Sequence, residues 1–190
     1  MALTLAIFLF SIVPFFLTTF LNLGGVIFNV AEGVIRLAIL LLYLASVALV
    51  GEFRRVFQYH GAEHTAINAY EAGVELNVSG AEKFSRFHPR CGTSFILIVT
   101  LISVLLFSIM PNLGFFIRLA YRILLIPVIG AISYEILKLS DKYKKSRIMR
   151  VLVAPGLGLQ YLTTRKPDDK MIEVALEAVK KVNSLAETKS

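Results

Sequence analysis

Long apolar runs constrain the fold of this chain more than any other sequence feature. Four of them cover residues 2–23, 26–50, 93–110 and 113–137. Crossing a bilayer as a helix takes about 20 mostly apolar residues, whereas the strands of a membrane barrel alternate apolar and polar residues. The runs do not alternate, as LAILLLYL at residues 37–44 illustrates. They therefore predict an all-α, polytopic membrane protein with about four transmembrane helices in two hairpins.

The composition agrees with this class. Only 17% of the 190 residues are charged and 56% are hydrophobic, whereas about a quarter of the residues of a soluble domain are charged. We divide the chain into a first transmembrane hairpin (1–50), a polar middle segment (51–92), a second hairpin (93–137) and a tail with a basic start and a helix (138–190). The single cysteine cannot form an intramolecular disulfide, so an oxidising compartment is not implied.

The basic residues predict the orientation in the membrane. The turns at 22–25 and 111–114 contain no lysine or arginine, whereas the middle segment and the tail contain many. The positive-inside rule assigns such segments to the cytoplasm. We therefore expect a multi-pass protein of the cytoplasmic membrane, with both termini and the middle segment cytoplasmic. The basic residues concerned are Arg54, Arg55, Lys83, Arg86, Arg90, Lys138, Lys142, Lys144, Lys145, Arg147 and Arg150.

A few charged residues lie inside the apolar runs. Glu32 and Arg36 lie near the outer end of the second predicted span, and Arg118 and Arg122 near the outer end of the fourth. Ions within a membrane are costly unless they are paired. We expect an ion-pair cluster of Glu32 with the arginines; in the alternative, the arginines reach outward to the membrane interface.

The middle segment contains a pair of histidines with the spacing of metal ligands. Good helix formers fill residues 57–73, and Gly73 is a plausible stop for this helix. On it, His60 and His64 are four residues apart and project from one face. With Glu63 they form H-x-x-E-H, a pattern of inverzincin metallopeptidases in which the glutamate handles protons.

A second ligand pair follows at the end of the same segment. Residues 79–82 (SGAE) form a capping-box signature that predicts a short helix. This helix leads to His88-Pro-Arg-Cys91, which resembles one arm of a zinc knuckle. Imidazole and thiolate together favour zinc over other divalent transition metals. We therefore expect His60, His64, His88 and Cys91 to converge on one metal ion.

The number of ligands would decide the role of the metal. Four protein ligands make a closed, structural zinc site, whereas three leave a position for water and catalysis. In the open case the three histidines, His60, His64 and His88, hold the metal, Glu63 is the general base, and Cys91 lies nearby as an alternate ligand. In the closed case Glu63 orients a histidine. Glu71 and Glu135 are further candidate ligands. Two arginines, Arg86 and Arg90, flank the site and could bind an anionic substrate or lipid headgroups.

The tail predicts contacts with the membrane and with partners. The basic run 138–150 would be attracted to anionic lipids; no aromatic or Gly-rich pattern typical of RNA binding accompanies it. We expect the motif PGLG at 155–158 to break the chain, and a new helix to begin near residues 167–169 (PDD). The apolar stripe of this helix predicts docking on the cytoplasmic face of the membrane domain; the alternative is a binding module.

Several segments together resemble a known family. They lie at 59–64, 70–71, 86–95, 133–135, 155–156, 160–164, 167–169 and 172–175. In them the chain is similar to the YqhQ-like family, bacterial membrane proteins of unknown function that are described as metal-dependent enzymes. The resemblance implies a metal-binding role for the His and Cys motifs, but neither a substrate nor a reaction.

Two functions from different classes remain open on the sequence. The first is a zinc-dependent membrane enzyme, hydrolytic in type, that acts on a lipid or peptide at the cytoplasmic interface, with Glu63 as catalytic residue. The second is a non-catalytic scaffold in which zinc joins two loop arms. The basic cytoplasmic face of this scaffold would bind a partner such as the translocation machinery or a ribosome.

Overall fold

The computed structural model describes residues 1–109, 114–143 and 146–188. All regular secondary structure in these ranges is helical, as predicted. The first three residues of the predicted turn at 111–114, as well as Lys144 and Lys145, lie outside the described ranges. The chain forms two compact units. Unit 1 comprises Met1–Leu44 with Gly92–Gly156, and unit 2 comprises Ala45–Cys91 with Leu157–Ser190.

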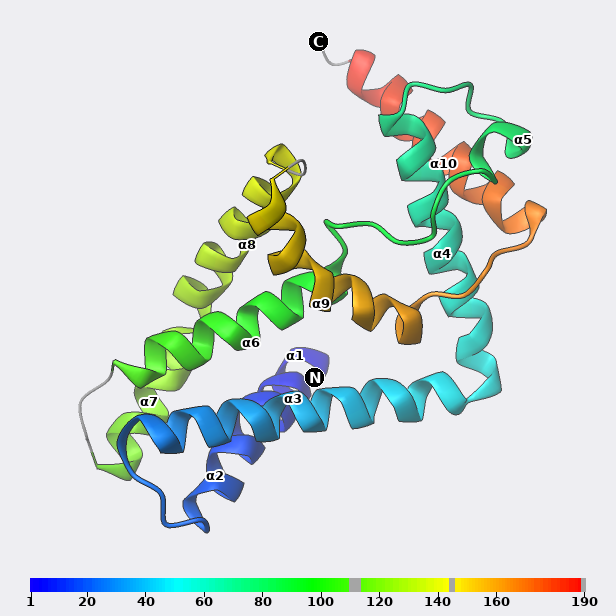
Figure 1. The fold of residues 1–190 in the computed structure, drawn as a ribbon. Helices are drawn as coiled ribbons and strands as arrows, with labels where there is room; N and C mark the ends of the chain where they lie inside the picture. Colours follow the sequence, from blue (N-terminus) through cyan, green and yellow to red (C-terminus); the bar gives the residue numbers. More distant parts are fainter. Residues whose placement is uncertain (110–113, 144–145, 189–190) are drawn as a thin grey trace. The chain divides into compact units, whose positions relative to one another are not determined.

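Unit 1 contains the apolar helices, and α6 packs alongside α8 (Figure 1). The first predicted span consists of three short pieces, one of them π-helical. The elements are α1 (Ala2–Ile7), the π-helix η1 (Phe8–Ile12), α2 (Val13–Thr19), α3 (Gly25–Leu49, whose end enters unit 2), α6 (Gly92–Ser108), α7 (Phe115–Leu124), α8 (Ile126–Lys142) and α9 (Arg147–Thr163) as far as Gly156.

One helix in the described ranges, α3, is long and apolar enough to cross a membrane by itself. The pair α7 and α8 passes the same test as one bent segment, with an angle of 43° between the two helices. The bend lies just before Pro127, the second residue of α8, because a proline ring clashes with the carbonyl four residues earlier and lacks an N–H group. The four-span topology remains a prediction.

The interior of unit 1 contains the predicted ion cluster. The carboxylate of Glu32 accepts hydrogen bonds from Nη2 of Arg36 at 2.7 Å and from Nε of Arg122 at 3.0 Å. Asn29 accepts a further bond from Nη2 of Arg122 at 2.9 Å, so α3 is connected to α7. Arg118 instead lies over the ring of Phe28, at 4.3 Å from its centroid. The prediction of a Glu32–arginine cluster is confirmed for Arg36 and Arg122.

Unit 2 is built around α4 (Gly51–Glu71), which lies beside α10 (Asp169–Glu187) (Figure 1). Alanines at 62, 66 and 69 form a flat, fully buried stripe on α4. The apolar stripe of α10, with Ile172 and Leu176 at its centre, packs against these alanines and against α5 (Val78–Ala81). The tail helix therefore docks on the middle segment. Its expected docking on the cytoplasmic face of the membrane domain remains a prediction.

The helix ends agree with the sequence signals at some positions and differ at others. The backbone after α4 turns at Gly73 with a positive φ of 68°, and Asp168 caps α10 by accepting a bond from the Met171 N–H at 2.9 Å. The N-cap of α5 is Asn77, whose side chain accepts from Gly80 N–H at 2.8 Å, so the predicted SGAE capping box does not form. Asparagine is at least as good an N-cap as serine and lies two residues earlier.

Helix α9 continues through the predicted break at 155–158, because Pro155 lies inside it. At the next residue, a Cβ on Gly156 would lie 2.6 Å from the Ser94 Oγ atom, so the backbone of α9 packs closely against the start of α6. Tertiary packing of this kind offsets the low helix propensity of proline and glycine.

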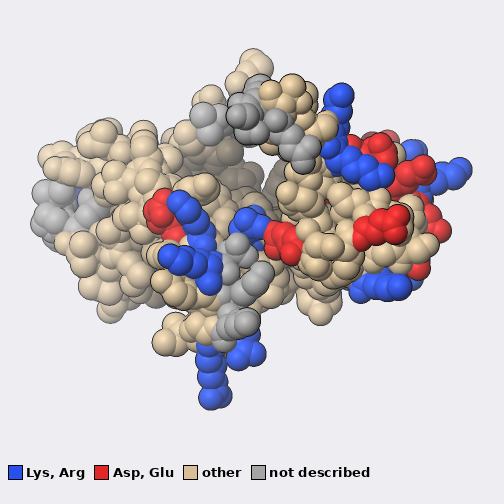
Figure 2. Space-filling view, turned by 90° about the horizontal axis from the view of Figure 1, so that it is seen from above, with Lys and Arg blue, Asp and Glu red and all other residues tan. Residues whose placement is uncertain are grey.

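The two units differ in surface character. Figure 2 shows one face, on which lysine, arginine, aspartate and glutamate are densest at the right, over α5 and α10 of unit 2. Unit 1 exposes many large apolar side chains, among them Val26, Ile27, Leu105, Phe116 and Leu124. Soluble monomers rarely expose contiguous apolar patches of large size. The surface of unit 1 is therefore suited to an apolar environment.

Gly61 on α4 allows the chain after α9 to pass close to the helix. A Cβ at this position would overlap the carbonyl oxygen of Arg165, and Arg165 N–H donates to the Phe57 carbonyl at 2.8 Å. The backbone at 165 therefore lies directly on the turn of α4 that contains His60. No larger residue fits at 61 without moving this segment.

We expect Gly61→Ala to lower the free energy of unfolding by about 1–3 kcal/mol, the usual cost of overpacking. Gly51→Ala is the matched control, because Gly51 is also in α4 and a Cβ there would meet nothing within 4 Å. The control should be neutral or stabilise by up to about 1 kcal/mol through helix propensity. Unfolding of the purified chain followed by circular dichroism measures both; equal changes in the two variants would contradict the close approach.

Candidate metal centre

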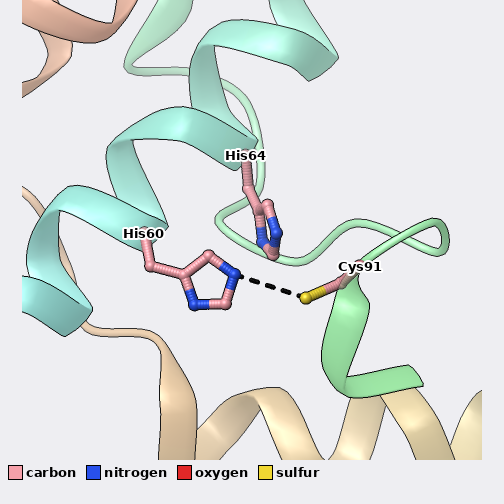
Figure 3. A group of neighbouring side chains, drawn as sticks. All are labelled: His60, His64 and Cys91. Carbon is pink, nitrogen blue, oxygen red and sulfur yellow. Dashed lines mark hydrogen bonds between the residues drawn. The ribbon is translucent and has the colours of Figure 1, made fainter. Parts of the chain in front are cut away.

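Three of the four predicted ligands converge. His60 and His64 project from successive turns of α4 toward Cys91, which directly precedes α6 (Figure 3). Their potential ligand atoms all lie within 4.8 Å of one another. The Nε2 atom of His60 lies 3.3 Å from Cys91 Sγ, and the two imidazole centroids are 4.4 Å apart. This group could bind a metal ion.

Backbone carbonyls fix the orientation of both imidazoles. His60 Nδ1–H donates to the Thr163 carbonyl at 2.8 Å, and His64 Nδ1–H donates to the Arg86 carbonyl at 2.7 Å. Because a carbonyl can only accept, each Nδ1 carries the hydrogen. In the neutral rings the lone pair is then on Nε2. Metal-binding histidines are usually oriented in this way, by a hydrogen bond from the nitrogen that does not bind the metal.

The thiol of Cys91 is the main influence on the pKa of His60. The hydrogen bond with Cys91 raises the pKa of His60 above its ordinary value, with a smaller effect from the Thr163 carbonyl, while burial acts in the opposite direction. His60 therefore holds its proton to a higher pH in the metal-free chain. A metal would compete with this proton and with the thiol proton. Two imidazoles and a thiolate are a donor set typical of zinc.

Two amides that the sequence analysis did not single out hold the second ligand segment in place. Asn68, one turn beyond His64 on α4, donates to the carbonyls of Ser85 at 2.7 Å and Phe87 at 3.1 Å. Gln160 is fully buried; its side chain donates to the His88 carbonyl at 2.8 Å and accepts from His88 N–H at 2.9 Å. For Asn68 the available sequence signal was its position four residues after His64. For Gln160 the signal was a lone amide within an apolar helix.

His88 lies beside the cluster and turns toward other partners. Its ring centroid is 5.8 Å from that of His64, but its Nε2 atom is 3.3 Å from the Glu71 carboxylate and its Nδ1 accepts from Arg90 N–H at 3.3 Å. Arg90 also pairs with Glu71. The structure thus groups His60, His64 and Cys91, and the role of His88 as a fourth ligand remains a prediction.

The carboxylates proposed from the sequence lie in different surroundings. Glu63 is exposed, and its charge contributes to the raised pKa of His60. Glu71 is engaged with His88 and Arg90. Glu135 is exposed on α8 in unit 1. The guanidinium of Arg86 lies over the ring of Phe87, at 5.0 Å. Of the three carboxylates, Glu63 is the nearest in sequence to His60 and His64.

We expect the purified chain to bind one zinc or cobalt ion per molecule. Replacing His60, His64 or Cys91 by alanine removes a donor atom and should weaken binding by more than the roughly 10–100-fold that changes outside the ligand set typically cause. Competition with a chromophoric chelator measures the affinity. His88→Ala is the control and should have the smaller effect; an effect equal to that of His60→Ala would instead place His88 among the ligands.

Comparisons with known proteins agree with the resemblance seen in the sequence. The family model described as a protein of unknown function (DUF1385) matches residues 1–185. The uncharacterised protein YqhQ of Bacillus subtilis (strain 168) is 38% identical over 177 residues, which cover 90% of this chain and 55% of that relative. The chain thus spans about half the length of the curated relative it matches. No solved structure matches significantly. The chain therefore belongs to the DUF1385 family of proteins of unknown function.

Proposed function

We propose that this protein is a zinc-dependent hydrolase of the bacterial cytoplasmic membrane, with His60, His64 and Cys91 as the zinc ligands. The observation that supports it is the donor set: one ring nitrogen from each of two histidines and one sulfur lie within 4.8 Å of one another, and both Nδ1 atoms are bonded to carbonyls. Three protein ligands leave a fourth position free, which is typical of catalytic zinc sites.

Each group of this chain has a separate task in the proposed reaction. When bound, zinc supplies a Lewis acid that polarises a carbonyl or phosphoryl oxygen and promotes the ionisation of water. Glu63, exposed beside the two histidines, takes up the proton from the attacking water. Thr163 and Arg86, through their carbonyls, keep the imidazoles in the required tautomer.

The substrate class follows from the proposed location. The length and hydropathy of α3, the apolar surface of unit 1 and the basic residues of the middle segment support a membrane protein whose unit 2 faces the cytoplasm. A substrate at this interface is a membrane lipid or a membrane-bound peptide. The pair Arg90–Glu71 with His88 would contact a polar or anionic part of it.

A second candidate function is a zinc-stabilised scaffold that binds a protein or ribosome at its basic cytoplasmic face. The bonds from His60 to Thr163 and from His64 to Arg86 favour it, since a metal at this position would connect three segments of unit 2. In this case the fourth position would be closed by a protein ligand such as His88, and Glu63 would have no chemical role.

Glu63→Gln separates the two functions. For the hydrolase we expect the variant to retain one zinc per chain and to lose about 10²-fold or more of its activity, the usual contribution of a general base. Hydrolysis of p-nitrophenyl acetate and of bis(p-nitrophenyl) phosphate by the zinc-loaded full chain in a mild detergent measures this.

The matched control is Glu52→Gln, which removes the same charge from an exposed position of the same helix. It should leave both zinc content and hydrolysis unchanged. Zinc-independent hydrolysis, or equal rates for the wild-type chain and Glu63→Gln, would contradict the enzyme. A zinc-loaded chain that hydrolyses neither probe, but unfolds at lower temperature after chelation, would favour the scaffold.

A further inference from the structure

Unit 1 contains a cavity of about 390 Å³, and none of the three candidate metal ligands lines it. Most of its wall is apolar, with Phe10, Phe95 and Ile129 among the lining residues. Two arginines, Arg36 and Arg122, line the same cavity. Ligand sites have this volume and this combination of an apolar wall with a few polar groups.

The arginines carry more charge than the surrounding residues neutralise. Arg36 is 8% exposed and Arg122 3%, and both bond to the same carboxylate, that of Glu32, which is 1% exposed. Among the aspartates and glutamates whose burial the structure describes, Glu32 is the only buried one. The buried cluster therefore has a net charge of about +1. An unmatched charge in a buried environment is strongly unfavourable unless a counter-ion pairs with it.

The hydrogen bonding of Arg36 is also incomplete. Nη1 of Arg36 donates to Ser103 Oγ at 2.7 Å and Nη2 to Glu32, but its Nε is buried without a hydrogen-bond partner in the part of the chain that the structure describes. A buried donor without a partner in a folded protein often marks the place of a missing ion or water. The unmatched donor therefore belongs to one of the two guanidiniums that share the unmatched charge.

Aromatic rings hold the second arginine in position. The guanidinium of Arg122 lies 4.5 Å from the ring centroid of Phe15 and 4.6 Å from that of Phe107. Cation–π contacts of this kind stabilise a buried cation without removing its charge. The arginines are thus fixed in the wall of the cavity, which lowers the ordering cost of binding an anion.

We propose that this cavity binds a single-chain anionic amphiphile. Its carboxylate or phosphate headgroup pairs with Arg36 and Arg122, and its acyl chain lies along Phe10, Phe95 and Ile129. A fatty acid and a lysophospholipid share this chemistry. The apolar wall favours an amphiphile over a small inorganic anion, and the excess positive charge favours an anion over a neutral lipid. The site is independent of the proposed zinc chemistry and is tested by binding alone.

Native mass spectrometry of the full chain in a neutral detergent, after removal of co-purified lipid, counts bound ligand for each of four probes. These are oleate, 1-oleoyl lysophosphatidate, oleyl alcohol and inorganic phosphate. We expect one oleate or one lysophosphatidate per chain, each bound about tenfold or more tightly than oleyl alcohol or phosphate. Binding of oleate alone identifies a carboxylate ligand, and binding of lysophosphatidate alone identifies a phosphate ligand.

Arg36→Gln should weaken binding of the anionic amphiphiles at least about tenfold, because it leaves Glu32 and Arg122 as a balanced pair. Arg118→Gln removes the same charge from a nearby position that does not line the cavity and should bind normally. Val99→Phe keeps the arginines and places a ring in the cavity, so it should also weaken binding if Arg36→Gln fails to fold.

Circular dichroism of each variant reports whether it is folded. No saturable binding of either anion, equal binding of oleyl alcohol, equal binding of inorganic phosphate, or undiminished binding by folded Arg36→Gln or Val99→Phe would each overturn the proposal.

Discussion

Hydrogen bonds from one face of α4 to backbone carbonyls organise unit 2. Within two turns of the helix, His60, His64 and Asn68 each donate to a carbonyl of a segment distant in sequence. The carbonyl bonds hold residues 85–87 and 163 against the helix and at the same time set the tautomers of both imidazoles. If these bonds were lost, the two imidazoles would no longer be held beside Cys91. The same contacts that fold unit 2 therefore prepare its candidate metal centre.

The small residues of α4 make this arrangement possible. Alanines on the opposite side of the helix allow α10 to pack closely, and Gly61 allows the backbone at Arg165 to reach the helix surface. Gln160 adds a pair of bonds to the backbone of His88, which places the turn that leads to Cys91. In unit 1 the corresponding role belongs to Glu32 of α3, whose single carboxylate binds Arg36 of the same helix and Arg122 of α7. There the excess of one positive charge is the property that points to a ligand.

Local sequence signals predicted the elements that depend on local interactions. The helix that contains His60 and His64, its stop at Gly73 and the N-cap Asp168 of α10 depend on hydrogen bonds within a few residues, and the structure has all three, although α4 begins at Gly51, six residues before the predicted start. The Glu32 cluster was predictable because a buried charge must be paired. The break before Pro127, the continuous helix through Pro155 and the cap at Asn77 were not predicted. Pro127 bends the helix, packing offsets the low helix propensity of Pro155, and Asn77 caps α5 in place of Ser79.

The sequence by itself determined the helical class, the family and the same-face placement of His60 and His64, because hydropathy, motif identity and helix periodicity require no distant contact. Only the tertiary structure decided that Cys91 approaches this pair while His88 turns toward Glu71. It also decided that the tail helix covers α4 and that two arginines share one carboxylate beside a cavity. These arrangements join segments separated by tens of residues, and the packing and hydrogen bonds that select them cannot be read from spacing in the chain.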